Sequence, residues 1–427
     1  MSRFFRLYAP LALVTIAAPV ALLAQTITFA TPKQFTVTLP DSASVARYSA
    51  ADFNADGKMD YLLEPWNQND LLDYALLMGN GSGSFTTVEA NVPVPFSLEY
   101  IVADVNNDGK ADIITLEPGC QKGDTCSQFA PGPNSPNNAT GSFKVYLNEG
   151  SGRFTNTFTG TLPQLGTLNF VAGDFNGDGK PDVAVLASSF NSNTIPGTPP
   201  QLIVFLNQGS GLFTQHTDTN LPSSMTTQTT NIGNLVTGNF IGTGHKDLLF
   251  SFEAGSGDPA PKAQIFILPN DGSGTFGKPK WAFDMTTTAP ADFIFADLNG
   301  DKLTDLLYLD GSIRDAVVLM AKSGGGFTQH NTVHYFIDFP SQWAFSDVNG
   351  DSKWDLAIDG ANSGSTAGTA AIFPGFGNGT FNQSYKALHP TSNAGQMAIA
   401  PLMKGRLPSV MFQTSSDGFE LYVNTTE

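Results

Sequence analysis

A nine-residue acidic loop with the pattern DxNxDGxxD recurs along this chain, and an apolar, strand-like run follows most of its copies. Internal repeats decide an architecture before any single residue does, because each repeat must be one structural unit. The seven loops, numbered one to seven, span residues 52–60, 104–112, 174–182, 239–247, 297–305, 347–355 and a degraded 401–409. They begin 50 to 70 residues apart, which is typical of the four-stranded blades of a β-propeller.

A second signal follows six of the loops. It consists of an apolar strand, a Gly-rich turn and a Phe, and each instance predicts a hairpin. These hairpins span residues 76–85, 145–154, 204–213, 266–276, 318–327 and 372–381. One unit therefore contains strand A, the acidic loop, strand B, a connection, strand C, the Gly-rich turn and strand D.

The predicted fold is all-β: a single seven-bladed β-propeller of four-stranded blades over residues 25–427, with the acidic loops between strands A and B. Abundant Gly (43) and Pro (27), with only 14% charged residues, suit short strands joined by tight turns. The seventh unit reaches only strand C, at 418–424. Residues 34–40 are predicted to supply its strand D and so close the ring, which leaves no unpaired strand edge.

The loop chemistry indicates calcium. Ca²⁺ takes six to eight oxygen ligands, and side chains at positions 1, 3, 5 and 9 of a tight loop, with the position 7 carbonyl, supply such a cage. Five loops carry the full set and predict about five structural Ca²⁺. Their ligands are Asp52, Asn54, Asp56, Lys58, Asp60; Asp104, Asn106, Asp108, Lys110, Asp112; Asp174, Asn176, Asp178, Lys180, Asp182; Asp297, Asn299, Asp301, Leu303, Asp305; Asp347, Asn349, Asp351, Lys353 and Asp355, where position 7 acts through its carbonyl.

Three loops depart from the full pattern. Loops five and six replace the position 6 Gly with Lys302 and Ser352, so we expect weaker or strained sites there. Loop four keeps only Asn239, Thr243 and Asp247 at cage positions and is expected to be free of metal, and loop seven has lost the cage. An acidic turn without metal is the alternative for any single copy, since Asp, Asn and Gly favour turns.

An EF-hand would place a bidentate Glu at position 12 within a helix, but strand-like runs such as DIITL and DVAVL follow these loops. In its loop pattern and in the spacing of the loops, the chain over about residues 34–427 resembles the FG-GAP or VCBS repeats of integrin α-subunit propellers and bacterial surface proteins. The resemblance implies that the metal loops lie on one face. Partners would bind the opposite face through the B to C and D to A connections.

Export is predicted from the first residues. Arg3 and Arg6 precede an apolar run from Leu11 to Ala24 that is short for a membrane span, so residues 1–24 are interpreted as a cleaved signal peptide. An uncleaved anchor is the alternative. The only two cysteines, Cys120 and Cys126, are then expected to form a disulfide in an oxidising compartment. The protein is predicted to be secreted or on the cell surface, with no membrane span after cleavage.

The partner is predicted to be a protein or a glycan. A net charge of -17 with no basic patch argues against nucleic acid. Long B to C connections at 117–141, 187–200 and 251–262 are the candidate recognition loops. Trp66, Trp281 and Trp343 are candidates either for stacking on a sugar or for packing between blades.

A non-catalytic binding or adhesion module is the first functional hypothesis, and a polysaccharide lyase or hydrolase is the alternative. The sequence has no HExxH, GxSxG or GK[ST] motif, so no catalytic residue is assigned. His330 and His334 lie four residues apart in a predicted strand, as either a surface pair or an incomplete metal pair.

Overall fold

The computed structural model of the chain describes most of the propeller, and the loop residues 52–60 to 401–409 are all included. The described residues are 26–39, 44–66, 74–90, 99–117, 126–127, 130–131, 141–162, 167–188, 200–222, 225, 232–252, 262–287, 293–365, 367–392 and 396–426. Residues 1–24, Cys120 and most of the three long connections lie outside these ranges. No helix within the described ranges is long and apolar enough to cross a membrane.

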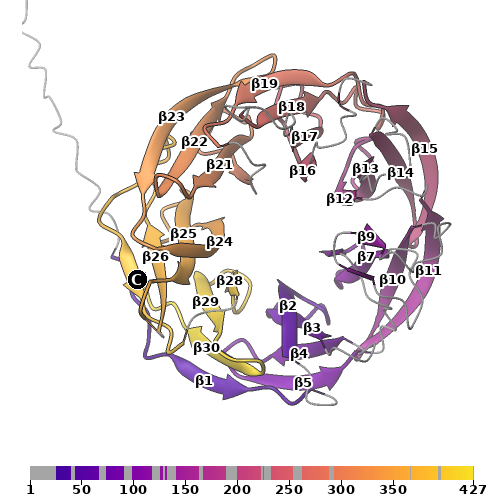
Figure 1. The fold of residues 1–427 in the computed structure, drawn as a ribbon. Coiled ribbons are helices and arrows are strands. Elements are labelled where there is room, and N and C mark those ends of the chain that lie inside the picture. Colours follow the sequence, from indigo (N-terminus) through magenta and orange to yellow (C-terminus); the bar gives the residue numbers. More distant parts are fainter. Residues whose placement is uncertain are drawn as a thin grey trace, which may run out of the picture.

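Seven four-stranded antiparallel sheets are arranged as blades around a ring, as the repeat predicts (Figure 1). The first three blades follow the chain from strand A near the centre to strand D at the rim. Blade 1 is β2 (Ser44–Ala51), β3 (Asp60–Trp66), β4 (Ala75–Gly79) and β5 (Phe85–Glu89); blade 2 is β6 (Glu99–Ala103), β7 (Asp112–Glu117), β10 (Ser142–Gly150) and β11 (Arg153–Thr161); blade 3 is β12 (Thr167–Gly173), β13 (Asp182–Ser188), β14 (Gln201–Gly209) and β15 (Leu212–Asn220).

The next three blades repeat this order. Blade 4 is β16 (Ile232–Gly238), β17 (Asp247–Phe252), β18 (Gln264–Leu268) and β19 (Lys280–Asp284); blade 5 is β20 (Ile294–Ala296), β21 (Asp305–Asp310), β22 (Asp315–Ala321) and β23 (Phe327–His334); blade 6 is β24 (Phe339–Ser346), β25 (Asp355–Ala361), β26 (Gly368–Phe373) and β27 (Lys386–Leu388). A separate short pair, β8 (Cys126–Ser127) and β9 (Ala130–Pro131), lies between β7 and β10 in the chain.

Blade 7 combines strands from both ends of the chain. It contains β28 (Met397–Pro401), β29 (Pro408–Gln413), β30 (Gly418–Tyr422) and, as its outer strand, β1 (Lys33–Thr36). β1 pairs antiparallel with β30 from Lys33 opposite Leu421 to Thr36 opposite Gly418. Figure 1 shows the two segments, coloured indigo and yellow, side by side. The predicted closing segment 34–40 thus overlaps the strand that closes the ring.

The B strands hold the ring together because both of their faces are buried. Alternate side chains of a strand point to opposite faces, so each B strand contributes to two of the seven apolar clusters between blades. On β3, Leu62 packs toward blade 2, whereas Tyr61 and Leu63 pack toward blade 7. Fully burying one such side chain contributes about 1.5–3 kcal/mol, which explains why the B strands are continuous apolar runs.

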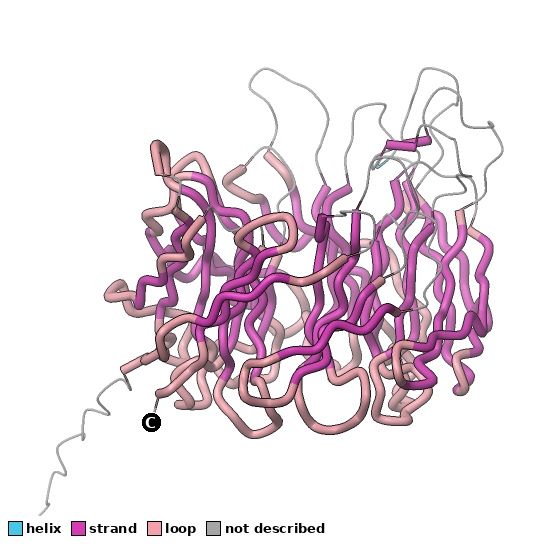
Figure 2. Tube along the Cα trace, turned by 90° about the horizontal axis from the view of Figure 1, so that it is seen from below, coloured by secondary structure: helices cyan, strands magenta, loops and turns pink. Residues whose placement is uncertain are grey.

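A, B, C and D alternate in direction, so the A to B loops and the C to D turns lie on one face, which we call the loop face. The B to C and D to A connections lie on the opposite face, and Figure 2 shows the ring from the side. Loops one to seven therefore all share one face of the propeller.

A buried carboxyl group interrupts the core of blade 6. Asp359 on β25 is fully buried, and its Oδ1 accepts hydrogen bonds from Ser341 Oγ (3.0 Å) and Gln342 N (2.8 Å). Its Oδ2 has no hydrogen-bond partner among the described residues. Burial raises the pKa of Asp359 to about 7, because a charge loses hydration there.

Stability is expected to depend on the titration of Asp359. The unfolded carboxyl loses its proton near pH 4 but the folded one near pH 7, so the free energy of unfolding falls by about 4 kcal/mol across that interval and is level above it. The free energy of unfolding of Asp359→Asn should therefore rise by about 3 kcal/mol relative to that of the wild type between pH 5 and pH 8. Urea titrations at both pH values measure this difference. Asp271→Asn, at an exposed turn, should show no such gain. Parallel curves for wild type and Asp359→Asn would contradict this account.

Candidate metal centres

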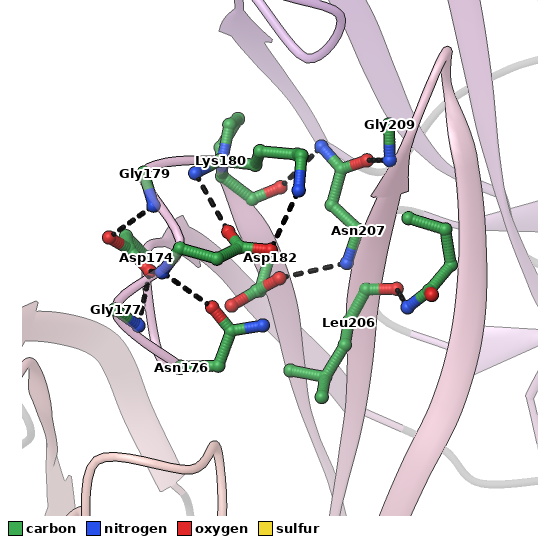
Figure 3. Close-up of polar contacts among 12 residues, drawn as sticks. Asp174, Asn176, Gly177, Gly179, Lys180, Asp182, Leu206, Asn207 and Gly209 are labelled. Atoms are coloured by element: carbon green, nitrogen blue, oxygen red, sulfur yellow. Dashed lines mark hydrogen bonds and ion pairs between the residues drawn. The ribbon is translucent and has the colours of Figure 1, made fainter.

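Positions 1 and 3 of loop three bring two predicted ligand oxygens together (Figure 3). Asp174 Oδ1 accepts hydrogen bonds from Gly177 N (2.7 Å) and Asp178 N (3.1 Å), and its Oδ2 accepts one from Gly179 N (2.9 Å). Asn176 Oδ1 accepts from the same Asp178 N at 2.9 Å. Because one N–H is shared, the two side-chain oxygens converge on one short stretch of backbone.

Loops one, two and five have the same shared N–H at position 5. The acceptors at positions 1 and 3 lie 3.2 and 3.0 Å from Asp56 N, 3.1 and 3.0 Å from Asp108 N, and 3.1 and 2.9 Å from Asp301 N. In loop six, Asp351 N donates to Asn349 Oδ1 at 2.9 Å, and Asn349 is fully buried with its Nδ2 unpartnered among the described residues. Loop six is therefore the least regular of the five.

The backbone strain expected in loops five and six is present, but it is not confined to them. Lys302 and Ser352 at position 6 have φ of 71° and 64°, in the left-handed region that favours Gly. Loops one and two have a non-Gly residue in the left-handed region at position 4, where Ala55 and Asn107 have φ of 59° and 58°. Loop three has Gly at both positions. Loops one, two, five and six thus each hold one non-Gly residue in this region, and loop three holds none.

The position 7 lysines contact the position 5 carboxylates. Lys58 Nζ and Lys180 Nζ lie 2.8 Å from Asp56 Oδ2 and Asp178 Oδ2, Lys110 pairs with Asp108, and Lys353 Nζ lies 3.3 Å from Asp351 Oδ2. The hydrogen bond from the Lys58 side chain is the largest cause of the lowered pKa of Asp56. These ammonium groups neutralise part of the loop charge, as a bound cation would.

Position 9 is a buried clamp between the loop and strand C. Asp182 is fully buried, and its two oxygens accept hydrogen bonds from Phe175 N (2.9 Å) at position 2 and Asn207 N (2.8 Å) at the end of strand C. Burial raises the pKa of Asp182. The same two-sided contact is made by Asp60, Asp112, Asp247, Asp305 and Asp355.

The clamp persists where the cage is lost. In loop four, Asp247 accepts Phe240 N (3.0 Å), Ile241 N (3.1 Å) and Asn270 N (3.0 Å), although Ile241 replaces the position 3 ligand. In loop seven, Ser409 Oγ accepts Asn424 N at 3.1 Å. Position 9 therefore has a structural role that needs no metal, and its assignment as a calcium ligand remains a proposal.

Four asparagines that sequence reasoning missed connect neighbouring loops. Asn207 Nδ2 donates to Pro181 O (3.2 Å) in its own loop and to Val105 O (2.8 Å) in the loop of the preceding blade. We call Asn148, Asn207, Asn270 and Asn424 the interblade asparagines, since each joins position 8 of its own loop to position 2 of the previous one. The position 2 side chain itself is apolar in all seven loops and is buried against the next blade.

The recurring signal was visible in the sequence, as Asn before the Gly-rich turn in three units and as an apolar residue at every position 2. What it did not show is that the Asn amide reaches the preceding blade, because that contact depends on how blades pack. Loops on adjacent blades are thus linked by hydrogen bonds through buried backbone carbonyls.

Asn207→Ala is expected to destabilise the propeller by about 1–3 kcal/mol, because one buried and one partly buried carbonyl acceptor lose their donor. Urea unfolding measures the change. Asn156→Ala, an exposed residue of β11, is the matched control and should cost less than about 0.5 kcal/mol. Equal effects of the two substitutions would show that Asn207 is not a structural link.

Loop four joins loop five directly. Asn239 Nδ2 donates to Lys302 O (2.7 Å), and Thr304 Oγ1 accepts from Asn239 N (2.9 Å). The Asn239 amide oxygen accepts Gly242 N and Gly244 N, as an Asp at position 1 does elsewhere. Loop four therefore keeps its turn with an amide and interloop hydrogen bonds in place of a carboxylate.

The oxygen atoms at positions 1, 3 and 5, with the position 7 carbonyl, are hard ligands of the kind that Ca²⁺ takes. In loops one, two, three and five, the oxygens of positions 1 and 3 lie together at the position 5 N–H. Across the described residues, no group of three or more His, Cys, Asp and Glu side chains is arranged to hold a metal.

The histidines, tryptophans and cysteines that the sequence singled out lie in different surroundings. His334 Nδ1 lies 3.0 Å from Asp315 Oδ1, and a bulge in β23 falls at His330, so the two histidines do not follow a simple alternation. Trp343 packs partly buried against the blade 5 to blade 6 cluster, whereas Trp281 is 58% exposed. The Cys120–Cys126 pair and the Trp66 side chain lie outside what the structure describes.

Comparison with known proteins identifies a repeat family for part of the chain. Residues 52–115 and 135–185 match the family model of the FG-GAP-like repeat, which covers the first and second loops and the third. No curated protein matches the chain.

Proposed function

We propose that this seven-bladed β-propeller, in which residues 52–115 and 135–185 match the FG-GAP-like repeat, is an exported, calcium-stabilised module that binds a protein or glycan without catalysis. The observation that supports the proposal is that the two faces of the propeller carry different segments of the repeat. The acidic loops occupy the loop face and are hydrogen-bonded into the ring, whereas the connections of the opposite face are the candidates for recognition. FG-GAP-like repeats suit a binding module at this coarse level, although a fold alone names no ligand.

The proposed calcium is structural. Positions 1, 3, 5 and the position 7 carbonyl of loops one, two, three, five and six would hold about five ions, with position 9 completing each cage. Bound Ca²⁺ would supply charge that holds these oxygens together, so its binding free energy would add to folding free energy. Weak affinity, about 10⁻⁴ to 10⁻³ M, is adequate in surroundings rich in calcium.

The proposed recognition surface includes the connections 117–141, 187–200 and 251–262. The test replaces each connection with a short Gly-Ser segment and compares binding of the chain to glycan and protein arrays in calcium. Loss of binding with unchanged melting temperature is expected for at least one replacement. A replacement of the turn 80–84 on the loop face is the matched control and should leave binding intact.

Two outcomes would overturn the proposal. Unchanged binding after all three replacements would remove this face as the recognition surface. New reducing ends or unsaturated products from incubated polysaccharides would identify a lyase or hydrolase in place of a binding module.

A further inference from the structure

Blade 4 presents an exposed indole beside two planar polar side chains at its outer edge. Trp281 is 58% exposed, and its Nε1 donates to Asp284 Oδ1 at 3.0 Å. Gln264 Nε2 donates to the same oxygen at 2.8 Å. The indole is therefore held by a hydrogen bond while its surface stays in solvent, which is an arrangement that a merely tolerated surface Trp does not need.

A β-bulge builds this arrangement. Asp284 pairs with Gln264 and Phe283 with Ile265, but Trp281 pairs with Phe266, so Ala282 is the extra residue. In a regular strand, residues three apart point to opposite faces. The bulge shifts the alternation by one and places Trp281 on the same face as Asp284 and Gln264, as bulges beside functional sites often do.

Two hydrogen-bond acceptors remain open beside the ring. Asp284 Oδ1 takes both donors, so among the described contacts Asp284 Oδ2 and Gln264 Oε1 have none. Both atoms accept hydrogen bonds, which suits a ligand that offers several hydroxyl donors. An aromatic face with a few fixed polar groups is the general composition of a small-ligand site.

The local charge selects among ligands. Asp284 carries a negative charge that repels uronate or sulfate groups, and the net charge of -17 acts in the same direction. A cationic ligand is attracted to an indole face and a carboxylate. A cationic ligand would be repelled by Lys262, which acts electrostatically on Asp284, and by the exposed Lys280 next to Trp281. A neutral polyhydroxyl ligand therefore fits this position best.

We propose that Trp281, Asp284 and Gln264 form a subsite for a neutral sugar unit of a glycan, with the sugar's C–H face on the indole and its hydroxyls on the two open acceptors. The subsite rests on the proposed binding function and specifies its ligand class. Gln264 follows the predicted recognition loop 251–262 by two residues, so the subsite adjoins the proposed surface in the chain.

The test measures binding of the full chain, in calcium, to neutral glucan, mannan and galactan oligosaccharides and to matched uronate oligosaccharides. Wild type should bind at least one neutral oligosaccharide and no uronate at this subsite. Trp281→Ala should weaken that binding by at least about tenfold, and Trp281→Phe should retain most of it because a flat ring remains. Phe339→Ala, which removes a 62% exposed aromatic on blade 6, is the matched control and should bind as wild type does.

The outcomes separate the subsite from the module. Equal glycan binding by wild type and Trp281→Ala, or binding of the uronate oligosaccharides alone, would overturn the subsite while the binding function stands. Binding to no array at all would overturn both. The subsite would be established if binding of a neutral glycan were lost in Trp281→Ala and in Asp284→Asn but kept in the control variant.

Discussion

Chelation of calcium is expected to lower the free energy of unfolding of this propeller by about 2.7 kcal/mol for each occupied loop, when calcium had been present at 100 times its Kd. Five loops make this the largest effect expected of any change discussed. The physical reason is that the unfolded chain has no converged cage, so calcium binds the folded state alone. Thermal unfolding with calcium and with EDTA measures the loss, and mass spectrometry of the native chain counts the ions.

Substitutions assign the effect to particular loops. Asp104→Ala and Asp174→Ala together should reduce the count by two and diminish the difference between calcium and EDTA. Thr243→Ala in loop four is the matched control and should leave the count unchanged, because Ile241 already breaks that cage. If the chain held no bound calcium and had the same melting temperature in EDTA, the calcium assignment would be wrong and the acidic loops would be turns without metal.

Asp247→Ala is expected to destabilise the protein by about 3–6 kcal/mol, and equally with calcium and with EDTA. The substitution leaves three N–H groups, of Phe240, Ile241 and Asn270, without their acceptor. Each orphaned buried donor costs about 1–3 kcal/mol, and the loss of a desolvated carboxylate offsets part of the sum. Urea unfolding in both buffers measures the effect.

Asp182→Ala is the informative comparison, since loop three has both the clamp and the full cage. It should lose a similar amount in EDTA and more in calcium. If Asp247→Ala were harmless, or if its cost disappeared in EDTA, the clamp would not be the structural role of position 9.

The sequence was sufficient for the architecture because the repeat marks both the A to B loop and the C to D hairpin of the first six blades. The acidic loop fixes the turn between strands A and B, and the Gly-rich turn fixes the hairpin between strands C and D. Even the closing strand was predictable: residues 34–40 were expected, and β1 is Lys33–Thr36. The strand begins one residue before the expected segment, at Lys33 opposite Leu421, and ends four residues before the expected end, at Thr36 opposite Gly418.

The site was predictable only within one blade. Loop spacing identified Asp174 and Asn176 as neighbours, because their convergence is local. It did not reveal that Asn207 reaches Val105, which lies 102 residues away on another blade. Nor did it show the bulge at Ala282, since a single extra residue in an edge strand leaves no mark in an alternating pattern. Contacts that depend on packing between blades or on register require the structure.

Pairing of β1 with β30 has a consequence for the order in which the molecule forms. Lys33 and Leu421 meet across almost the whole chain, and closing a flexible segment of that length costs about 5 kcal/mol of entropy. Blades 1 to 6 involve contacts within about 60 residues each and can form earlier, since local contacts form faster. The first strand of the propeller must therefore wait for the last blade, and until then both edges of the open ring are exposed to pairing with other chains.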